Sequence, residues 1–166
     1  LTVPNCTILT HPTDADKSSK LKPNFSGNWP FVDMKDGNRS DFRKIPGKSD
    51  RSLDMAYFTD LSEGWYSVTN NELGLSWAVE FPKDIFKYIW YWRNFGGSYG
   101  YPFYGRSYNA GLEPCTSWHN DGVKEAQNNG TALPVKAGEY ISAKMKAGII
   151  LGNTTDQNKN PFINRT

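Results

Sequence analysis

The sequence predicts an all-β fold, most simply a β-sandwich. Apolar residues alternate with small or polar ones through "LGLSWAVEFP" at 73–82, which is the period of a strand with one face on a core. "FKYIWYWR" at 86–93 also reads as a strand, with bulky side chains on both faces. Only "DGVKEAQNNG" at 121–130 suggests a helix, and a short one. These three observations favour sheets over helical architectures.

Length and composition fit a globular chain. The 166 residues suit one domain or part of a larger one, and the hydrophobic fraction of 37% with 22% charged residues excludes a disordered or fibrous chain. We find no internal repeat and no hinge. The range 1–166 is therefore interpreted as a single β-sandwich domain or part of one.

The elements follow in order along the chain. Residues 1–50 are rich in Pro, Gly, Asp, Asn and Lys and are expected to form loops with short strands. Strands are predicted in "LDMAYFTDL" at 53–61 and in "EGWYSVTN" at 63–70. In the 73–82 strand the side chains expected on the core face are Leu73, Leu75, Trp77, Val79 and Phe81.

The next predicted strand is rich in aromatic residues, and the last predicted strand is half-exposed. Both faces of the 86–93 strand carry large side chains, so we expect both to be covered. One face has Phe86, Tyr88, Trp90 and Trp92, and the other has Lys87, Ile89, Tyr91 and Arg93. Near the end, "EYISAKMKAGI" at 139–149 follows the turn "KAGE" and predicts a half-exposed strand.

Glu113 closes the segment "YGYPFYGRSYNAGLEPCTSW" at 99–118. If 104–113 is a strand, Gly105, Ser107, Asn109, Gly111 and Glu113 share one small, polar face, opposite Tyr104, Arg106, Tyr108, Ala110 and Leu112. Small residues leave a hollow, and a carboxylate and an amide at its edge suit a polyhydroxylated ligand. The alternative is that a loop covers the face and a backbone amide satisfies Glu113.

The aromatic side chains of 90–104 allow two interpretations. Trp90, Trp92, Tyr101 and Tyr104 can stack on the apolar faces of sugar rings, or they can simply belong to a core. The glycines of "NFGGSYGYP" are typical of a loop, since neither a Lys-Ser/Thr pair nor a strand-loop-helix context follows. We therefore predict no nucleotide site.

Charge and rare residues exclude several other functions. Lys and Arg exceed Asp and Glu by two and are scattered along the chain, which argues against a nucleic-acid partner. No apolar run is long enough for a membrane helix.

The two cysteines, Cys6 and Cys115, lack the spacing of a metal site. We expect them to be buried thiols, although a disulfide between them is left open. His119 is expected to be a surface or structural histidine, and no metal site is predicted. Six N-x-S/T sequons allow a secreted origin, although an Asn-rich chain also produces such matches by chance.

Two stretches resemble a known enzyme family. "YIWYWRNFGGSYGYPFYGRSYNAGLEPCTSW" and "GTALPVKAGEYISAKMKAGI" resemble the C-terminal part of aldose 1-epimerase (galactose mutarotase-like) proteins. The "GLEPCTS" motif is the more specific part, and the likeness extends back through "NWPFVDMKDGNRSDF" and "DMAYFTDLSEGWYSVTN".

The resemblance implies a fold, a reaction and a catalytic residue. It implies a mainly antiparallel β-supersandwich that binds a monosaccharide and interconverts its α and β anomers without a cofactor, using a glutamate base and a histidine acid. Glu113 matches the family glutamate. The candidate sugar-binding residues are Trp90, Trp92, Arg93, Tyr101, Tyr104, Arg106, Asn109 and His119. By analogy with bacterial relatives, a cytoplasmic location is implied.

The chain also departs from the family pattern. The family's catalytic histidine and a sugar-binding arginine come from an N-terminal half that nothing here matches, so neither His11 nor His119 is assigned as the acid. We expect a C-terminal portion, partnered by a missing N-terminal half or a second copy. The alternatives are a non-catalytic carbohydrate-binding β-sandwich and a purely structural or interaction domain.

Overall fold

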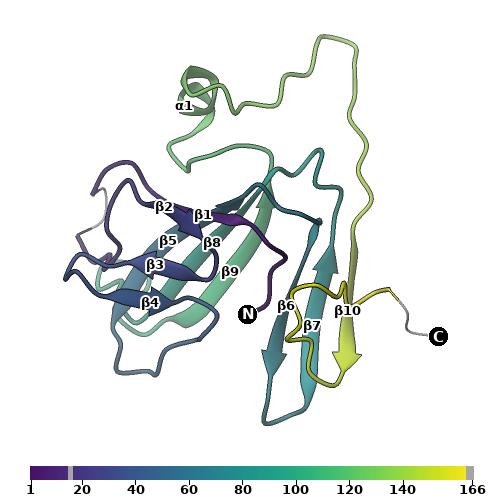
Figure 1. Ribbon diagram of the computed structural model, residues 1–166. Coiled ribbons are helices and arrows are strands. Elements are labelled where there is room, and N and C mark those ends of the chain that lie inside the picture. The colour runs from purple at the N-terminus through teal and green to yellow at the C-terminus, as the bar shows by residue number, and fades with distance from the viewer. Residues whose placement is uncertain (15–16, 164–166) are drawn as a thin grey trace. The chain divides into compact units, whose positions relative to one another are not determined.

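The computed structural model describes residues 1–14 and 17–163 and is built mostly of antiparallel β-sheet, which confirms the all-β prediction (Figure 1). The chain divides into two compact units. Unit 1 contains Leu1–Cys6, Asp60–Tyr88 and Cys115–Thr166, and unit 2 contains Thr7–Thr59 and Ile89–Pro114. Each unit is described by itself.

Unit 2 is built on a five-stranded sheet with the order β2-β1-β5-β8-β9. Its strands are β1 (Thr7–Thr10), β2 (Ser26–Asn28), β5 (Ser52–Thr59), β8 (Tyr88–Phe95) and β9 (Tyr108–Cys115). The pairs β1–β2, β1–β5 and β5–β8 are antiparallel. The short strands β1 and β2 lie in the part predicted to be loop-rich.

One face of this sheet is a closed core. Ile89, Tyr91, Arg93 and Phe95 of β8 are all at most 4% exposed and pair with alternate residues of β5. A hairpin of β3 (Phe31–Asp33) and β4 (Arg39–Asp41) lies against this face (Figure 1), and the next residue, Phe42, packs on Arg93 and Tyr91. We call it the Arg93 face.

The opposite face of the sheet, here called the Trp90 face, carries Trp90 and Trp92. Both are half-buried, whereas the residues of β8 on the Arg93 face are buried. The alternation predicted for 86–93 is therefore confirmed from Tyr88, where the strand begins, but the two faces differ in how completely they are covered.

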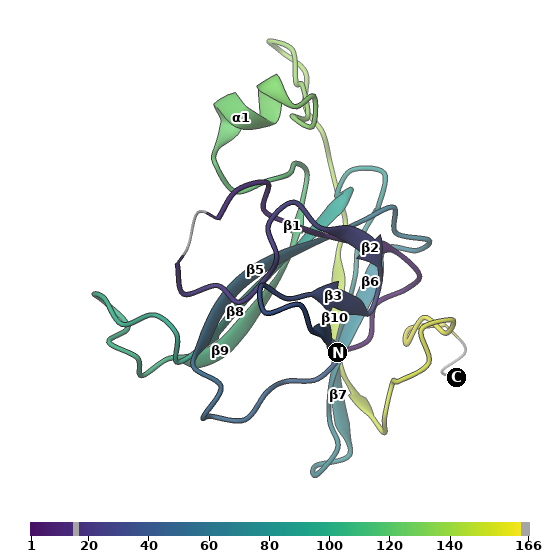
Figure 2. The same cartoon turned by 60° about the vertical axis from the view of Figure 1, so that its left-hand side comes forward.

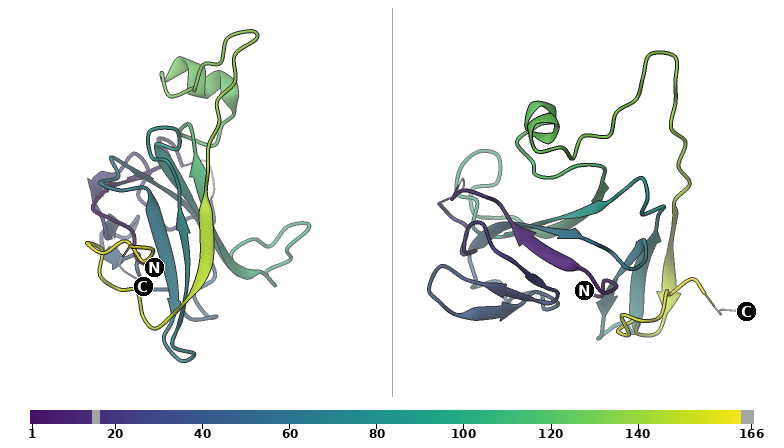
Figure 3. Two further views of the ribbon diagram at one scale, coloured as in Figure 1. Left: turned by 90° about the vertical axis from the view of Figure 1, so that its right-hand side faces the viewer. Right: turned by 45° about the horizontal axis from the view of Figure 1, so that its top comes forward.

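Unit 1 contains a three-stranded antiparallel sheet with the order β10-β7-β6, made by β6 (Trp65–Asn70), β7 (Leu75–Glu80) and β10 (Lys146–Leu151). The predicted helix is α1 (Val123–Asn128). Figure 3 shows the extended segment that joins α1 to β10. The strand predicted at 139–149 begins only at Lys146, because Lys146 pairs with Glu80, where β7 ends. Earlier residues therefore have no strand of this sheet to pair with.

Of the five residues predicted to face the core, Val79 and Phe81 are buried and Leu75 is half-buried, but the prediction is wrong for Leu73 and Trp77. Leu73 is 67% and Trp77 47% exposed, whereas Ser76 and Ala78 are buried. The physical reason is a buried polar network on the Ser76 side. The Thr154 hydroxyl donates to the Ser67 hydroxyl at 2.8 Å, and the Ser76 hydroxyl donates to the Gly152 carbonyl at 2.9 Å. These bonds hold the segment after β10 against the polar face of the sheet and bury that face.

The strand predicted at 104–113 is shifted. β9 begins at Tyr108, and residues 101–105 form turns in which Tyr104 has a φ of 48°. Figure 2 shows the loop between β8 and β9 extending beyond the ends of both strands. Turn hydrogen bonds replace the ladder here: the Gly105 amide donates to the Ser98 carbonyl at 2.6 Å and the Tyr104 amide to the Gly100 carbonyl at 2.9 Å.

Cys6 and Cys115 form no disulfide, and both are half-buried. Burial, with a smaller contribution from the Asp60 carboxylate, raises the pKa of Cys6 to about 12. In the described part of the chain, no helix is long and apolar enough to cross a membrane.

Candidate functional site

Glu113 lies on β9, with its carboxylate folded back over Gly111. A Cβ atom built at Gly111 would lie 2.8 Å from Glu113 Oε1, which is closer than such atoms approach. The absence of a side chain at Gly111 therefore makes the space that the carboxylate occupies. Glu113 is exposed and makes no hydrogen bond or ion pair with any residue that the structure describes. A carboxylate held in this way is available to accept a proton or a hydrogen bond from a ligand.

The position of Tyr108 shows which face of the sheet Glu113 shares. The Tyr108 ring packs on Phe95 with 5.2 Å between centroids, and its hydroxyl donates to the carbonyl of Pro46, which lines a cavity with Arg93. Tyr108 is thus on the Arg93 face. Because side chains alternate along a strand, Asn109, Gly111 and Glu113 are on the Trp90 face.

Two tryptophans form the floor beside this carboxylate. Trp90 meets Tyr57 edge to face at 6.1 Å, and Trp92 packs on Phe103 at 5.8 Å. These contacts fix the indole rings while leaving each ring half-exposed. Fixed aromatic surfaces of this kind suit the apolar face of a sugar ring.

Asn94 adds an amide that the sequence analysis missed. It is two residues beyond Trp92 and so lies on the same face, and it is fully buried. Neither its Oδ1 nor its Nδ2 has a hydrogen-bond partner among the described residues. Buried polar groups are normally hydrogen-bonded, so this amide donor and acceptor would gain from a hydroxyl group or a water molecule beside them. The alternating run "WRN" carries the signal, but the predicted strand ended at Arg93.

His11 was also missed as a member of this face. Leu9 pairs with Tyr57, so Leu9 is on the Trp90 face, and His11 follows two residues later. The ladder continues past β1, since the Asn24 amide donates to the His11 carbonyl at 2.8 Å. The imidazole is half-buried, with Nδ1 3.1 Å from the backbone nitrogen of Thr13. Treating 1–50 as loop-rich concealed the alternation in "TILTH".

The spacing of the strands sets the width of the site. β1 and β9 are separated by β5 and β8, which makes three strand spacings, or about 14 Å between the two backbones. Side chains from β9 and from the end of β1 therefore stand on either side of the tryptophan floor. Glu113 and His11 therefore lie toward opposite sides of this face of the sheet, with the strands β5 and β8 between them.

The remaining predicted site residues lie elsewhere. Arg93 is on the opposite face. Tyr101 and Tyr104 are 84% and 59% exposed and contact each other edge to face in the projecting loop, where Arg106 also lies. The structure thus brings Trp90, Trp92, Asn109 and Glu113 onto one face and leaves the loop residues outside it.

His119 belongs to unit 1. It is 6% exposed, its Nδ1 lies 3.4 Å from the Asp121 carboxylate, and its ring meets Trp118 edge to face. His119 is therefore buried rather than on the surface, and its sugar-binding role stays a prediction.

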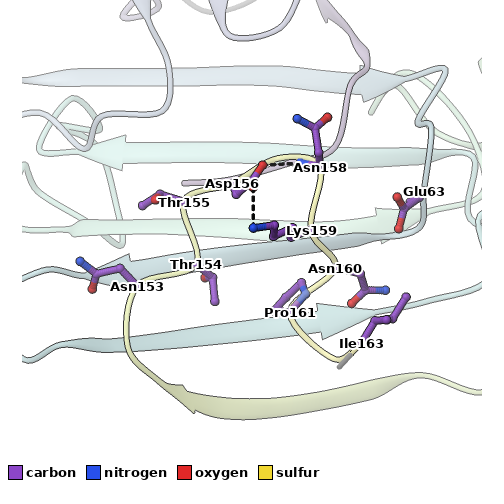
Figure 4. A pocket seen from close by; sticks show the side chains of 10 residues that line it. All are labelled: Glu63, Asn153, Thr154, Thr155, Asp156, Asn158, Lys159, Asn160, Pro161 and Ile163. Atoms are coloured by element: carbon purple, nitrogen blue, oxygen red, sulfur yellow. Dashed lines mark hydrogen bonds and ion pairs between the residues drawn. The ribbon is translucent and has the colours of Figure 1, made fainter. Parts of the chain in front are cut away.

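Unit 1 also has a polar cavity of about 600 Å³, bordered by Glu63 and by the turn-rich segment 153–163 (Figure 4). Its polar groups bind one another. Asp156 accepts from the Asn158 amide at 3.0 Å and pairs with Lys159 at 3.5 Å, while Asn160 donates to Glu80 at 2.6 Å. Because these groups are engaged locally, the cavity is a weaker candidate than the Trp90 face.

No protein-family model, curated protein or solved structure matches this chain.

Proposed function

We propose that the chain binds a free aldose on the Trp90 face and interconverts its α and β anomers. The observation that carries this proposal is the unpartnered carboxylate of Glu113, held over Gly111 on the same sheet face as Trp90 and Trp92. The resemblance of the "GLEPCTS" motif to aldose 1-epimerases supports the same role for Glu113.

The reaction needs two proton transfers. Glu113 removes the proton of the anomeric hydroxyl while an acid protonates the ring oxygen, and the bond between C1 and the ring oxygen breaks to give the open-chain aldehyde. Rotation about the C1–C2 bond presents the other carbonyl face. Reclosure reverses both transfers, so the two groups end in their starting protonation states.

His11 is the acid in this proposal. It is the imidazole of unit 2, and it lies on the same face as Glu113, across the tryptophan floor. Trp90 and Trp92 fix the plane of the ring, while the exposed amide of Asn109 binds a hydroxyl. No cofactor takes part in either transfer.

Two-dimensional exchange NMR of the anomer signals of glucose and of galactose tests the proposal. The buffer must contain no phosphate, because buffer acids and bases also catalyse ring opening. We expect the protein to accelerate exchange and Glu113→Gln to remove about 100-fold or more of the acceleration, with sugar binding retained. Glu72→Gln, in the exposed turn after β6, is the control and should behave as wild type. Equal rates for Glu113→Gln and wild type would refute the role of Glu113.

A non-catalytic sugar-binding function is the second candidate, since the half-exposed indoles of Trp90 and Trp92 provide stacking surfaces without any acid or base. It predicts saturable binding with no acceleration of exchange. Trp90→Ala and Trp92→Ala should each weaken binding, and unchanged affinity in both variants would exclude this face as a sugar site.

A further inference from the structure

Unit 2 contains a cavity on the Arg93 face, opposite the proposed sugar site. It measures about 290 Å³ and is lined by side chains of β4, β5 and β8, by Lys20 and by the loop that follows β4. Charged side chains dominate its lining.

Arg93 is the deepest cation of this cavity. It is 4% exposed, and neither its Nε nor its Nη1 has a hydrogen-bond partner among the described residues. Its guanidinium carbon lies 3.6 Å from the centre of the Phe42 ring and 5.4 Å and 5.3 Å from those of Tyr91 and Phe95. The aromatic faces stabilise the positive charge but leave these N–H groups without acceptors.

The carboxylates around Arg93 are already engaged. Asp54 Oδ1 accepts from the Ser19 hydroxyl at 3.0 Å and from the Lys20 amide at 2.9 Å. Lys20 Nζ donates to Asp50 at 3.0 Å. Asp50 also accepts from the Ser52 hydroxyl, and these bonds, with the nearby charge of Arg93, hold the pKa of Asp50 below its usual value against the effect of burial.

The rim of the cavity shows the same pattern. Asp41 binds Arg43 at 2.7 Å, and Arg39 pairs with Asp33 at 3.2 Å, so these charges satisfy each other. Lys44 is exposed at the rim, and its side chain makes no hydrogen bond or ion pair with any residue in the described ranges. The donors left without acceptors are therefore those of Arg93 and Lys44, and both are positive.

We propose that this cavity binds a compact oxyanion, either a carboxylate or a phosphate group, with Arg93 at its base and Lys44 at its rim. A buried cation is costly unless an anion or hydrogen-bond acceptors compensate it. A guanidinium presents planar N–H donors that match oxyanions, and these bonds are stronger than neutral ones. The site is separate from the proposed sugar site because side chains on opposite faces of one sheet line the two.

Titration with inorganic phosphate, and separately with acetate, tests this proposal. Backbone amide shifts of Phe42 and Asp54 are followed by NMR at constant ionic strength set with chloride. We expect saturable shifts with at least one of the two anions, and which of them saturates identifies the source of the oxyanion. Shifts that rise linearly with both anions would overturn the proposal.

Matched variants separate the site from general charge effects. Arg93→Gln should weaken binding at least tenfold, whereas Arg106→Gln removes the same charge from an exposed side chain that does not line the cavity and should change the affinity less than twofold. Equal effects of the two substitutions would refute a specific role for Arg93.

Two further variants keep the test decisive. If Arg93→Gln does not fold, Lys44→Gln serves instead, because that side chain is exposed, and a threefold or greater loss of affinity is expected. An unchanged affinity would contradict the proposed rim contact. Glu113→Gln should bind the anion as wild type does, so failure of the sugar proposal leaves this result unaffected.

Discussion

At the scale of single residues, Gly111 controls where the Glu113 carboxylate can lie. Alanine at this position would place its Cβ 2.8 Å from Glu113 Oε1, and the next nearest atoms, also of Glu113, are 3.7 Å away or farther. We expect Gly111→Ala to displace the carboxylate and reduce anomer exchange about tenfold or more, since small misplacements of a catalytic group are costly. Unfolding free energy should change by less than about 1 kcal/mol.

Exchange NMR and chemical denaturation of Gly111→Ala distinguish displacement from unfolding. A loss of activity that matches the loss of folded protein would show that Gly111 serves the strand rather than the carboxylate. Gly100→Ala is a suitable companion, since nothing lies within 4 Å of the Cβ position and φ is not positive there.

At the scale of elements, Gly97 sets how closely the end of β8 approaches the start of β5. Ser52 bridges to Gly96, and the Gly97 amide donates to the Ser52 carbonyl oxygen at 3.2 Å. A Cβ at Gly97 would lie 2.2 Å from the carbonyl carbon of Ser52 and 2.4 Å from the backbone nitrogen of Leu53. No rotation of a flexible side chain relieves a clash with backbone.

Gly97→Ala should therefore destabilise the protein by about 3 kcal/mol, the upper end for forced backbone shifts. Gly100→Ala, in the same loop, should change the unfolding free energy by less than about 0.5 kcal/mol. Urea denaturation of both variants provides the measurement. Similar midpoints would mean that the Gly96–Ser52 bridge opens at little cost.

The element scale also shows what the sequence could predict. Alternation gave the faces of β8 correctly because both faces carry large side chains that pack within unit 2. It failed for β7, where Ser67, Ser76 and Thr154 form a polar network that buries the less apolar face. Hydrogen bonds between residues more than 70 positions apart leave no periodic signal in either segment.

The candidate site was predicted in part for the same reason. Glu113, Trp90, Trp92 and Asn109 follow from strand periodicity on β8 and β9. His11 joins them only through the pairing of β1 with β5, which short-range patterns do not encode. Tyr104 and Arg106 were placed on a strand, whereas turn hydrogen bonds in and next to "GYPFYG" fold this part of the chain into a loop.

At the scale of the whole molecule, the three-stranded sheet of unit 1 presents apolar side chains to solvent. Trp77, Ile149 and Leu151 are 47%, 72% and 79% exposed, and Trp77 pairs directly with Ile149. Adjacent exposed apolar groups favour association. We therefore expect concentrated solutions to contain dimers or larger species formed by this face, as the sequence analysis anticipated for a second copy.

Light scattering over a range of concentrations tests this expectation. Ile149→Lys should shift the average mass toward the monomer, because a buried lysine would disfavour the contact. Asn71→Lys adds the same charge in the exposed turn between β6 and β7 and should have little effect. A monomer at every concentration in the wild type would contradict self-association.

The division into two units has a consequence for dissecting the protein. The chain passes between the units four times, after residues 6, 59, 88 and 114. Removing residues from the N-terminus through β1 therefore takes part of both units. A split after Thr59, in contrast, places β5 in one polypeptide and β8 in the other, although the two strands pair along seven residue positions. Coexpression of these two pieces would turn the pairing of β5 with β8 into a complementation assay, in which recovered anomer exchange reports directly on reassembly of the sheet.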